Sequence, residues 1–193
     1  MGEMTSDLIR VITDFPKPGI IFKDITPLLA DAKALNDCCE KIASYAKDAD
    51  YIAGIEARGF ILASAVAVLS GKGFIPIRKS GKLPGQVISQ SYELEYGQAT
   101  LEIHSDLVPA GKKVLIVDDV LATGGTALAS VELIEKTSLI PTCLVFLHSL
   151  VSHALAAGED VNQLGDEALI ALDQWWINKP CSEIANLTNQ DDK

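Results

Sequence analysis

Basic residues are scarce in this sequence, and arginine is especially rare. Lysine and arginine together number 16 against 26 aspartate and glutamate residues, which gives a formal net charge of −10. A chain this acidic does not attract nucleic acid or an anionic membrane through its overall field. Any phosphate that it binds must be held by a local basic cluster or by backbone dipoles. The arginines are Arg10, Arg58 and Arg78.

Long apolar runs, export signals and cysteine pairs are also lacking. The longest apolar run, residues 59–69, is well short of the ~20 residues that cross a bilayer. The N-terminus lacks the basic start and apolar core of a signal peptide. The cysteines form no Cys-x-x-Cys and have no zinc-type spacing with histidine; they are Cys38, Cys39, Cys143 and Cys181. We therefore expect reduced thiols, a cytoplasmic protein, no membrane contact and no protein-bound metal.

The composition is that of an ordinary globular domain. Hydrophobic residues make up 48% and charged residues 22% of the 193 residues, which excludes global disorder. A chain of this length can bury one complete hydrophobic core without disulfides or a structural metal. We expect a single domain over residues 1–174, followed by a C-terminal tail at 175–193 to which no role is assigned.

Strand-like and helix-like segments alternate along the chain. The strongest run, Lys113–Val117, is apolar after its first residue, as is typical of a central parallel strand. Two short strands around Gly97 predict a hairpin. The pattern predicts strands over 51–55, 74–77, 113–117, 141–150 and 168–172, and helices over 32–47, 60–69 and 127–136. The expected fold class is α/β, with a mainly parallel sheet flanked by helices.

The segment VLIVDDVLATGGT, residues 114–126, carries the clearest chemistry. A buried strand delivers Asp118 and Asp119 to the carboxyl edge of the sheet, where α/β folds bind their ligands. Gly124 and Gly125 allow successive N–H groups to turn toward one point at the start of a helix, whose partial positive charge favours a phosphate. Because carboxylates accept hydrogen bonds from hydroxyls, the segment predicts a site for a ribose 5-phosphate. It is neither a Walker loop nor a dinucleotide-binding turn.

Two further segments are unsuited to regular structure. Residues 15–19, FPKPG, place two prolines around one residue and then a glycine, which excludes both helix and regular strand. Residues 78–90 begin RKSGKLPGQV, with three basic residues and little to bury. We expect a long mobile loop there, and loops of this length inside compact domains are usually functional.

These segments together resemble a known family. VLIVDDVLATGGT is similar to the phosphoribosyl-pyrophosphate (PRPP) motif of the type I phosphoribosyltransferases. FPKPGIIFKDITPLL, IEARGF, IRKSGKLPG and SYELEYG resemble, in order, segments of the adenine phosphoribosyltransferases. The resemblance covers roughly three quarters of the chain, from about residue 7 to about residue 150. It implies the type I phosphoribosyltransferase fold, with a small hood at about 14–29, a mobile catalytic loop at about 78–97 and the PRPP loop at 114–126.

The resemblance implies transfer of the 5-phosphoribosyl group of PRPP to N9 of adenine, giving AMP and pyrophosphate in purine salvage. Magnesium would enter carried by PRPP, and the protein would act as a homodimer with no nucleic-acid or membrane partner. The reaction passes through a transition state with oxocarbenium character at the ribose. It therefore needs a clamp on the ribose phosphate, neutralisation of the leaving pyrophosphate and a handle on the base.

The resemblance also assigns residues to the PRPP and AMP site. Residues 122–126 would hold the 5-phosphate, the paired aspartates the ribose hydroxyls, and the arginine of IEARGF the pyrophosphate. This set is Arg58, Asp118, Asp119, Ala122, Thr123, Gly124, Gly125 and Thr126. The pyrophosphate and loop set, acting partly across a dimer interface, is Arg78, Lys79, Lys82 and Tyr96.

The base would be held by Ile21, Phe22 and Lys23 of the hood. Phe22 would stack on adenine, and backbone groups near Ile21 and Lys23 would read its edge. Lys23 stands where the family often has arginine, and the change keeps the charge but loses the planar fork. Glu95 resembles the family's catalytic residue, an acid/base at the purine N7 edge. Its residue type and position alone indicate an exposed hairpin carboxylate.

Two other functions remain open from the sequence. The first is a phosphoribosyltransferase for another nucleobase, which would keep the PRPP loop and change the hood. The second is a PRPP-sensing regulator that binds without catalysis. Such regulators carry a preceding DNA-binding domain, whereas few residues precede Phe15 here and the chain is acidic.

Overall fold

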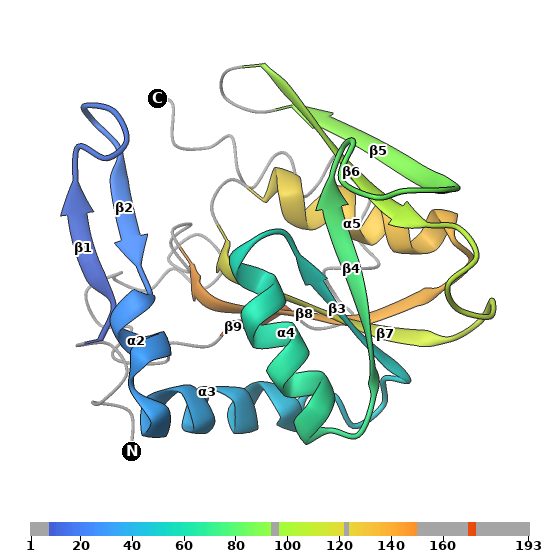
Figure 1. Ribbon diagram of the computed structural model, residues 1–193, viewed down its shortest axis with the longest axis horizontal. Coiled ribbons are helices and arrows are strands. Elements are labelled where there is room, and N and C mark those ends of the chain that lie inside the picture. Colours follow the sequence, from blue (N-terminus) through green and yellow to red (C-terminus); the bar gives the residue numbers. More distant parts are fainter. Residues whose placement is uncertain (1–7, 94–96, 122–123, 150–169, 173–193) are drawn as a thin grey trace, which may run out of the picture.

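The computed structural model describes residues 8–93, 97–121, 124–149 and 170–172 (Figure 1). Its helices are α2 (Thr26–Ala30), α3 (Ala32–Ser44), α4 (Arg58–Leu69) and α5 (Gly125–Lys136). Its strands are β1 (Arg10–Thr13), β2 (Ile21–Asp24), β3 (Tyr51–Ile55), β4 (Gly73–Lys79), β5 (Val87–Glu93), β6 (Gln98–His104), β7 (Lys113–Leu121), β8 (Ile140–Ser149) and β9 (Ile170–Leu172).

A seven-stranded sheet with the order β5-β6-β4-β3-β7-β8-β9 forms the centre of the molecule. Strands β4, β3, β7 and β8 run parallel to one another. The margins are antiparallel, with β6 against β4, β5 against β6 and β9 against β8. β7 lies between two parallel strands, and Val114 to Val117 are buried, as its unbroken apolar sequence predicts. The expected α/β fold with a parallel sheet is confirmed, and the parallel part is its core.

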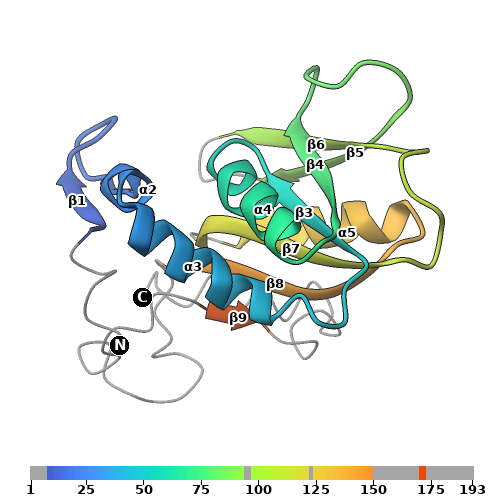
Figure 2. The same ribbon diagram turned by 60° about the horizontal axis from the view of Figure 1, so that its bottom comes forward.

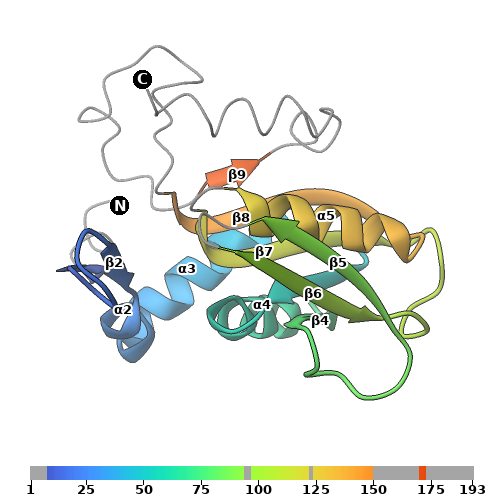
Figure 3. The ribbon, with the colours of Figure 1, turned by 90° about the horizontal axis from the view of Figure 1, so that it is seen from above.

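Alternate residues of the central strands face two separate cores. Leu115 and Val117 pack with α3 and α4, whereas Val114 and Ile116 pack with α5 and the antiparallel margin. Figures 2 and 3 show α3 and α4 on one face of the sheet and α5 on the other. This three-layer arrangement leaves the carboxyl ends of β3 and β7 beside the first turns of α4 and α5.

The hood is a separate two-stranded hairpin. β1 and β2 pair antiparallel, from Arg10 opposite Asp24 to Thr13 opposite Ile21, and α2 follows at once. The hairpin stands beside the main sheet rather than within it (Figure 1). Its turn, residues 14–20, contains the two prolines and is irregular, as expected. The sequence analysis did not find β1, because all four of its residues are exposed and show no alternation.

Several element boundaries differ from the sequence expectations. β4 continues through Lys79 and β5 already begins at Val87, so the expected loop at 78–90 is reduced to residues 80–86. Both strands are longer than expected because each pairs antiparallel with β6, and a local sequence pattern does not reveal this pairing. β7 likewise runs past the two aspartates to Leu121. The predicted hairpin around Gly97 and the last strand near 168–172 are confirmed.

In the part of the chain that the structure describes, no helix is both long and apolar enough to span a membrane. The longest apolar segment of the sequence forms α4, which packs Leu62, Ala63 and Val66 into the core. Cys38 and Cys39 are buried free thiols, and Cys143 is buried as well. Burial raises the pKa of Cys38 to about 12 and raises that of Cys39, so neither thiol ionises near neutral pH.

Candidate active site

Asp118 and Asp119 lie near the carboxyl end of β7, between the first turns of two helices. Burial first, and then the neighbouring Asp119 carboxylate, raise the pKa of Asp118 to about 8. Burial also raises the pKa of Asp119, although Arg58 opposes that shift. Asp118 Oδ1 accepts a hydrogen bond from the backbone N–H of Asp119 at 2.9 Å. Ionising these two carboxyl groups is therefore unfavourable in the unliganded site. Hydroxyl donors or a cation bound beside them would stabilise their ionised forms.

Gly59 explains how α4 can begin so close to these carboxylates. A methyl group at Gly59 would lie 2.7 Å from Asp118 Oδ1 and 2.8 Å from the carbonyl oxygen of Val117. Both distances are below ordinary contact, so glycine is needed for the close approach. The sequence analysis quoted this glycine within IEARGF but assigned it no role.

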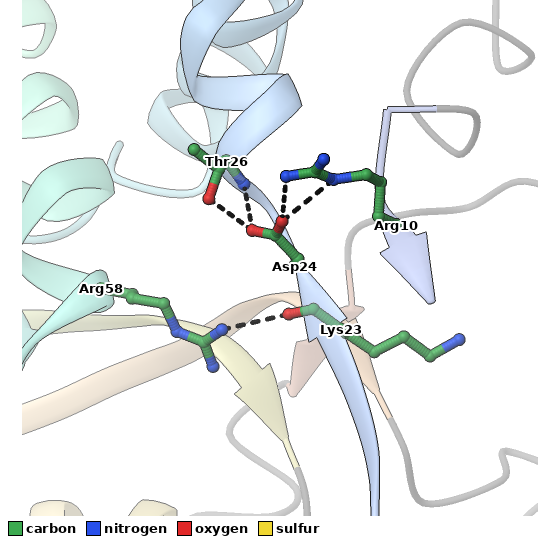
Figure 4. Close-up of polar contacts among 5 residues, drawn as sticks. All are labelled: Arg10, Lys23, Asp24, Thr26 and Arg58. Atoms are coloured by element: carbon green, nitrogen blue, oxygen red, sulfur yellow. Dashed lines mark hydrogen bonds and ion pairs between the residues drawn. The ribbon is translucent and has the colours of Figure 1, made fainter. Parts of the chain in front are cut away.

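Arg58 joins the hood to the sheet edge. Its Nε lies 2.8 Å from Asp119 Oδ2, and Nη1 donates to the carbonyl oxygen of Lys23 at 3.1 Å. The guanidinium carbon also lies 5.1 Å from the centre of the Phe22 ring, a cation–π distance. Figure 4 shows Arg58 reaching the Lys23 carbonyl while the Lys23 side chain extends the other way.

Asp119 keeps an unsatisfied oxygen despite this ion pair. The Arg58 contact lacks hydrogen-bond geometry, so buried Oδ2 has no hydrogen-bond donor among the described residues. The Asp119 side chain is only 5% exposed, whereas Arg58 is 36% exposed. A buried carboxylate oxygen without a donor is costly, and a ligand hydroxyl would satisfy it.

Asp24 is a hood residue that sequence reasoning missed. Its carboxylate accepts from the backbone N–H of Thr26 at 2.9 Å, from the Thr26 hydroxyl, and from Arg10 Nε and Nη2 at 3.0 and 2.5 Å (Figure 4). These donors, above all the Thr26 hydroxyl, lower the pKa of Asp24 to about 2. One carboxylate thus ties β1, β2 and α2 together. The spacing Asp-x-Thr before a short helix was the available signal.

The residues expected to bind adenine lie on β2. Ile21 is exposed, and Phe22 is half-buried with its ring edge-on to Phe15 at 5.1 Å between centres. The carbonyl of Lys23 is already occupied by Arg58. This oxygen has a second lone pair, so it can accept from a base as well.

The expected phosphate site lies at the N-terminus of α5. Gly124 caps the helix with a φ of +82°, which only glycine adopts without strain. Gly125 packs against β5, since a methyl group there would lie 3.3 Å from the carbonyl oxygen of Glu93. The Thr126 hydroxyl donates to Tyr92 Oη at 3.1 Å. Ala122 and Thr123 lie outside the described residues.

Arg78 and the lysines near it lie at the base of the 80–86 loop. Arg78 pairs with Glu56 through Nη2 at 2.8 Å and Nε at 3.3 Å, and the backbone N–H of Lys79 donates to the same carboxylate at 3.0 Å. Arg78 Nη1 also holds the carbonyl of Lys82 at 2.9 Å. The Arg78 hydrogen bond is the main reason that the pKa of Glu56 is lowered. The side chains of Lys79 and Lys82 are exposed.

Glu102 is a second carboxylate that anchors this loop and that the sequence analysis did not select. It is 7% exposed, accepts from Ser80 Oγ at 2.5 Å and accepts from the backbone N–H of Gly81 at 2.9 Å. Its partners lie more than twenty residues earlier, so no local motif announces the contact. Of the expected loop and catalytic residues, Glu95 and Tyr96 lie outside the described residues.

Comparison with known proteins identifies the class of this fold and site. Residues 24–159 match the family model described as the phosphoribosyl transferase domain. That range contains the paired aspartates, the glycine cap of α5 and Arg58, and it makes the chain a phosphoribosyltransferase-family protein.

The particular family follows from individual relatives. The chain is 59% identical over 145 residues to the adenine phosphoribosyltransferase of Halothermothrix orenii, covering 74% of this chain and 85% of the relative. It is 55% identical to that of Thermobifida fusca, over 66% of this chain and 74% of the relative. The crystal structure of the enzyme from Thermoanaerobacter pseudethanolicus matches with a TM-score of 0.74 and 50% identity, over 77% of this chain and 88% of that one. The chain belongs to the adenine phosphoribosyltransferase family.

One solved relative shows what such a protein binds. The adenine phosphoribosyltransferase of Saccharomyces cerevisiae, determined in complex with adenine and an imino-altritol bisphosphate, has a TM-score of 0.74 and 34% identity. The match covers 77% of this chain and 88% of that one. The family expected from the sequence motifs is thereby confirmed.

Proposed function

We propose that this protein transfers the 5-phosphoribosyl group of PRPP to N9 of adenine and releases pyrophosphate and AMP. It is an adenine phosphoribosyltransferase, a transferase of purine salvage. The observation that supports this most directly is the position of Arg58, which links the hood strand to the ribose-binding edge of the sheet. A base held at Phe22 and a ribose held at Asp119 would be brought together by one guanidinium.

The ribose 5-phosphate is held by the α5 edge. Residues 122–126 surround the phosphate, with the left-handed cap at Gly124 and the positive end of the helix supplying backbone donors. Asp118 and Asp119 accept the ribose hydroxyls, and Asp119 Oδ2 gains the donor it lacks. Ligand binding favours the ionised forms of both carboxylates, so it lowers the pKa values that burial raises.

The leaving pyrophosphate needs positive charge that the rest of this acidic chain does not offer. Arg58 stands near the ribose edge, while exposed Lys79 precedes the 80–86 loop and exposed Lys82 lies within it. Arg78 is held by Glu56 and would approach pyrophosphate only by sharing or exchanging that partner. The pyrophosphate and loop set consists of Arg78, Lys79, Lys82 and Tyr96. Closure of the loop would exclude water from the ribose.

Adenine is held against Phe22 by stacking, and backbone groups near Ile21 and Lys23 read its edge. Glu95 acts as the acid/base at N7 of the purine. Glu95→Gln keeps the size and hydrogen bonding of the side chain but removes its exchangeable proton. We expect turnover to fall ~10²–10⁴-fold with little change in PRPP affinity. Near-normal turnover would exclude the catalytic role.

Magnesium enters as part of the PRPP substrate. Hard oxygen donors suit this ion, and it keeps several waters and substrate phosphates as ligands. Asp118 and Asp119 are the carboxylates at the proposed ribose edge, and the described residues contain no cluster of three or more potential metal-binding side chains. Both carboxylates are assigned to the ribose hydroxyls, so we propose that magnesium enters as a ligand of PRPP. When bound, the ion neutralises developing charge on the pyrophosphate.

The protein acts as a homodimer in the cytoplasm. The exposed side of α4 carries Ile61, Val68 and Leu69, which are 45%, 81% and 51% exposed. Apolar side chains grouped on one helix favour burial against a second copy. Light scattering should give twice the chain mass, and Val68→Glu should shift the protein toward monomer. The buried free thiols of Cys38 and Cys39 suit a reducing compartment.

One assay tests the activity directly. Adenine, PRPP and magnesium are mixed with the protein, and AMP formation is followed by ultraviolet absorbance, with hypoxanthine and guanine as comparison bases. Rapid turnover of adenine alone is expected. Equal turnover of hypoxanthine would indicate a broader nucleobase specificity, and PRPP binding without turnover of any base would indicate a regulator.

A further inference from the structure

Tyr92 on β5 lies directly against the first turn of α5. Its hydroxyl oxygen accepts the hydrogen of Thr126 Oγ1 at 3.1 Å. A methyl group at Gly125 would lie 3.3 Å from Tyr92 Cδ2, so the ring also covers the helix at the neighbouring residue. The side chain is half-buried and packs on the core below α5. Tyr92 therefore contacts two adjacent residues of the expected phosphate site.

The hydrogen bond uses the one proton that Thr126 has to give. A hydroxyl donates one hydrogen bond and accepts up to two. A phosphate at the N-terminus of α5 offers only acceptors, so Thr126 must turn its proton away from Tyr92 to reach it. The Tyr92 hydroxyl can then donate to Thr126 Oγ1, and the two hydroxyls point the same way toward the phosphate. Such aligned chains of hydroxyls strengthen one another.

A second contact fixes the other end of β5 on the same helix. Lys136, the last residue of α5, donates through Nζ to the carbonyl of Ser89 at 3.5 Å and to the side-chain oxygen of Gln90. β5 thus follows α5 from its first turn to its last. Only the Tyr92 contact reaches the expected phosphate residues, and Glu95 follows Tyr92 by three positions in the chain.

We propose that Tyr92 is a positioning residue, which orients the Thr126 hydroxyl for the 5-phosphate. The proposal rests on the proposed function, because it takes the N-terminus of α5 as the 5-phosphate site. Tyr92 does not touch the reacting atoms. It acts through Thr126 on binding of the ribose phosphate.

Tyr92→Phe distinguishes the contribution of the hydroxyl from that of the ring, because phenylalanine lacks the hydroxyl and retains the packing against Gly125. The KM for PRPP and the dissociation constant of ribose 5-phosphate should both rise roughly five- to tenfold, the loss of about one hydrogen bond. Inhibition by pyrophosphate alone should not change. Lys136→Gln is the matched control, because it removes the other attachment of β5 to α5, and it should leave these constants at wild-type values.

A double-mutant cycle with Thr126→Val shows whether Tyr92 acts through Thr126. In the Thr126→Val background, Tyr92→Phe should have no further effect on ribose 5-phosphate binding. An undiminished effect in that background, an equal effect of Lys136→Gln, or unchanged binding in Tyr92→Phe would each overturn the inference. Failure of the proposed function is distinguishable, because the wild-type protein would then form no AMP or bind no ribose 5-phosphate.

Discussion

The hood and the phosphate edge of the sheet are built in opposite ways. The hood is a two-stranded hairpin whose apolar residues Val11, Phe15 and Ile21 are 57%, 50% and 54% exposed. At the phosphate edge, β7 is paired on both sides and Asp119 is almost fully buried. The proposed stacking surface for the base can remain open, whereas the proposed site for ribose and phosphate gains strength from buried, fixed dipoles.

The two regions also differ in what holds them. The hood depends on a few polar contacts around Asp24 and on the link through Arg58. The phosphate edge is held by the core itself, with Ala127 and Val131 of α5 packed beneath it. Damage to the hood should therefore affect base binding first, and damage to the edge should affect PRPP binding first. Four substitutions test this comparison.

The largest effect is expected from Gly124→Val at the phosphate edge. Valine in a left-handed conformation costs about 1–2 kcal/mol and its branched side chain obstructs the approach of a phosphate. PRPP binding, measured by calorimetry, should be lost while the circular dichroism spectrum remains that of a folded protein. Gly111→Val places the same strain, at a φ of +78°, in a distant turn, and it should bind PRPP normally. Retained PRPP affinity in folded Gly124→Val would disprove the phosphate assignment.

Arg58→Gln breaks the connection between the two regions. Removing one partner of a buried ion pair costs about 3–5 kcal/mol of stability. Because Arg58 is partly exposed and solvent screens its charge, the cost for this pair is below that range. We expect kcat/KM to fall by roughly two orders of magnitude, with the KM values of adenine and PRPP both raised. Arg58→Lys keeps a charge for Asp119 without the planar fork, so it should restore PRPP binding more than adenine binding. An effect confined to one substrate would contradict the bridging role.

Asp24→Asn loosens the hood alone. Asparagine keeps the shape of the side chain but loses the charge that holds Arg10, so the KM for adenine should rise several-fold while that for PRPP stays constant. Because the pKa of Asp24 is lowered to about 2, its stabilising contribution is complete above its ordinary pKa and is lost as pH falls through about 2. The control is Asp37→Asn, which breaks an exposed ion pair with Lys33 on α3. It should leave both KM values unchanged.

The fourth substitution concerns the pH dependence of stability at the phosphate edge, and its effect on substrate binding is not the quantity measured. The folded pKa of Asp118 is raised from 3.8 to about 8, so the folded state binds the proton more tightly than the unfolded state. The wild-type protein should lose stability relative to Asp118→Asn as pH rises from about 4 to about 8. Urea midpoints measured in parallel across this range give the difference. Saturating PRPP with magnesium should reduce the slope, and parallel curves without ligand would show that the carboxyl is not perturbed.

Local patterns in the sequence were sufficient for the central elements and for the family. Tyr51–Ile55 was predicted with its observed bounds, because a short apolar run buried on both faces has a distinctive composition. The segment from Val114 to Thr126 was informative for a similar reason, since a strand, two carboxylates and a glycine pair stand in consecutive order. The roles given to all the site residues, Glu95 and Tyr96 among them, remain predictions.

Tertiary structure decided everything that depends on partners distant in sequence. The sequence alone determined that a buried parallel strand brings two aspartates and a glycine-capped helix to one edge, because burial, turn geometry and helix dipoles are properties of neighbouring residues. It did not determine that Arg58 would meet Lys23, that Glu56 would hold Arg78, or that Thr126 would donate to Tyr92. Those contacts join residues 35, 22 and 34 positions apart. They exist because the packing of the layers brings the hood, the loop base and β5 to the ends of the same helices and strands.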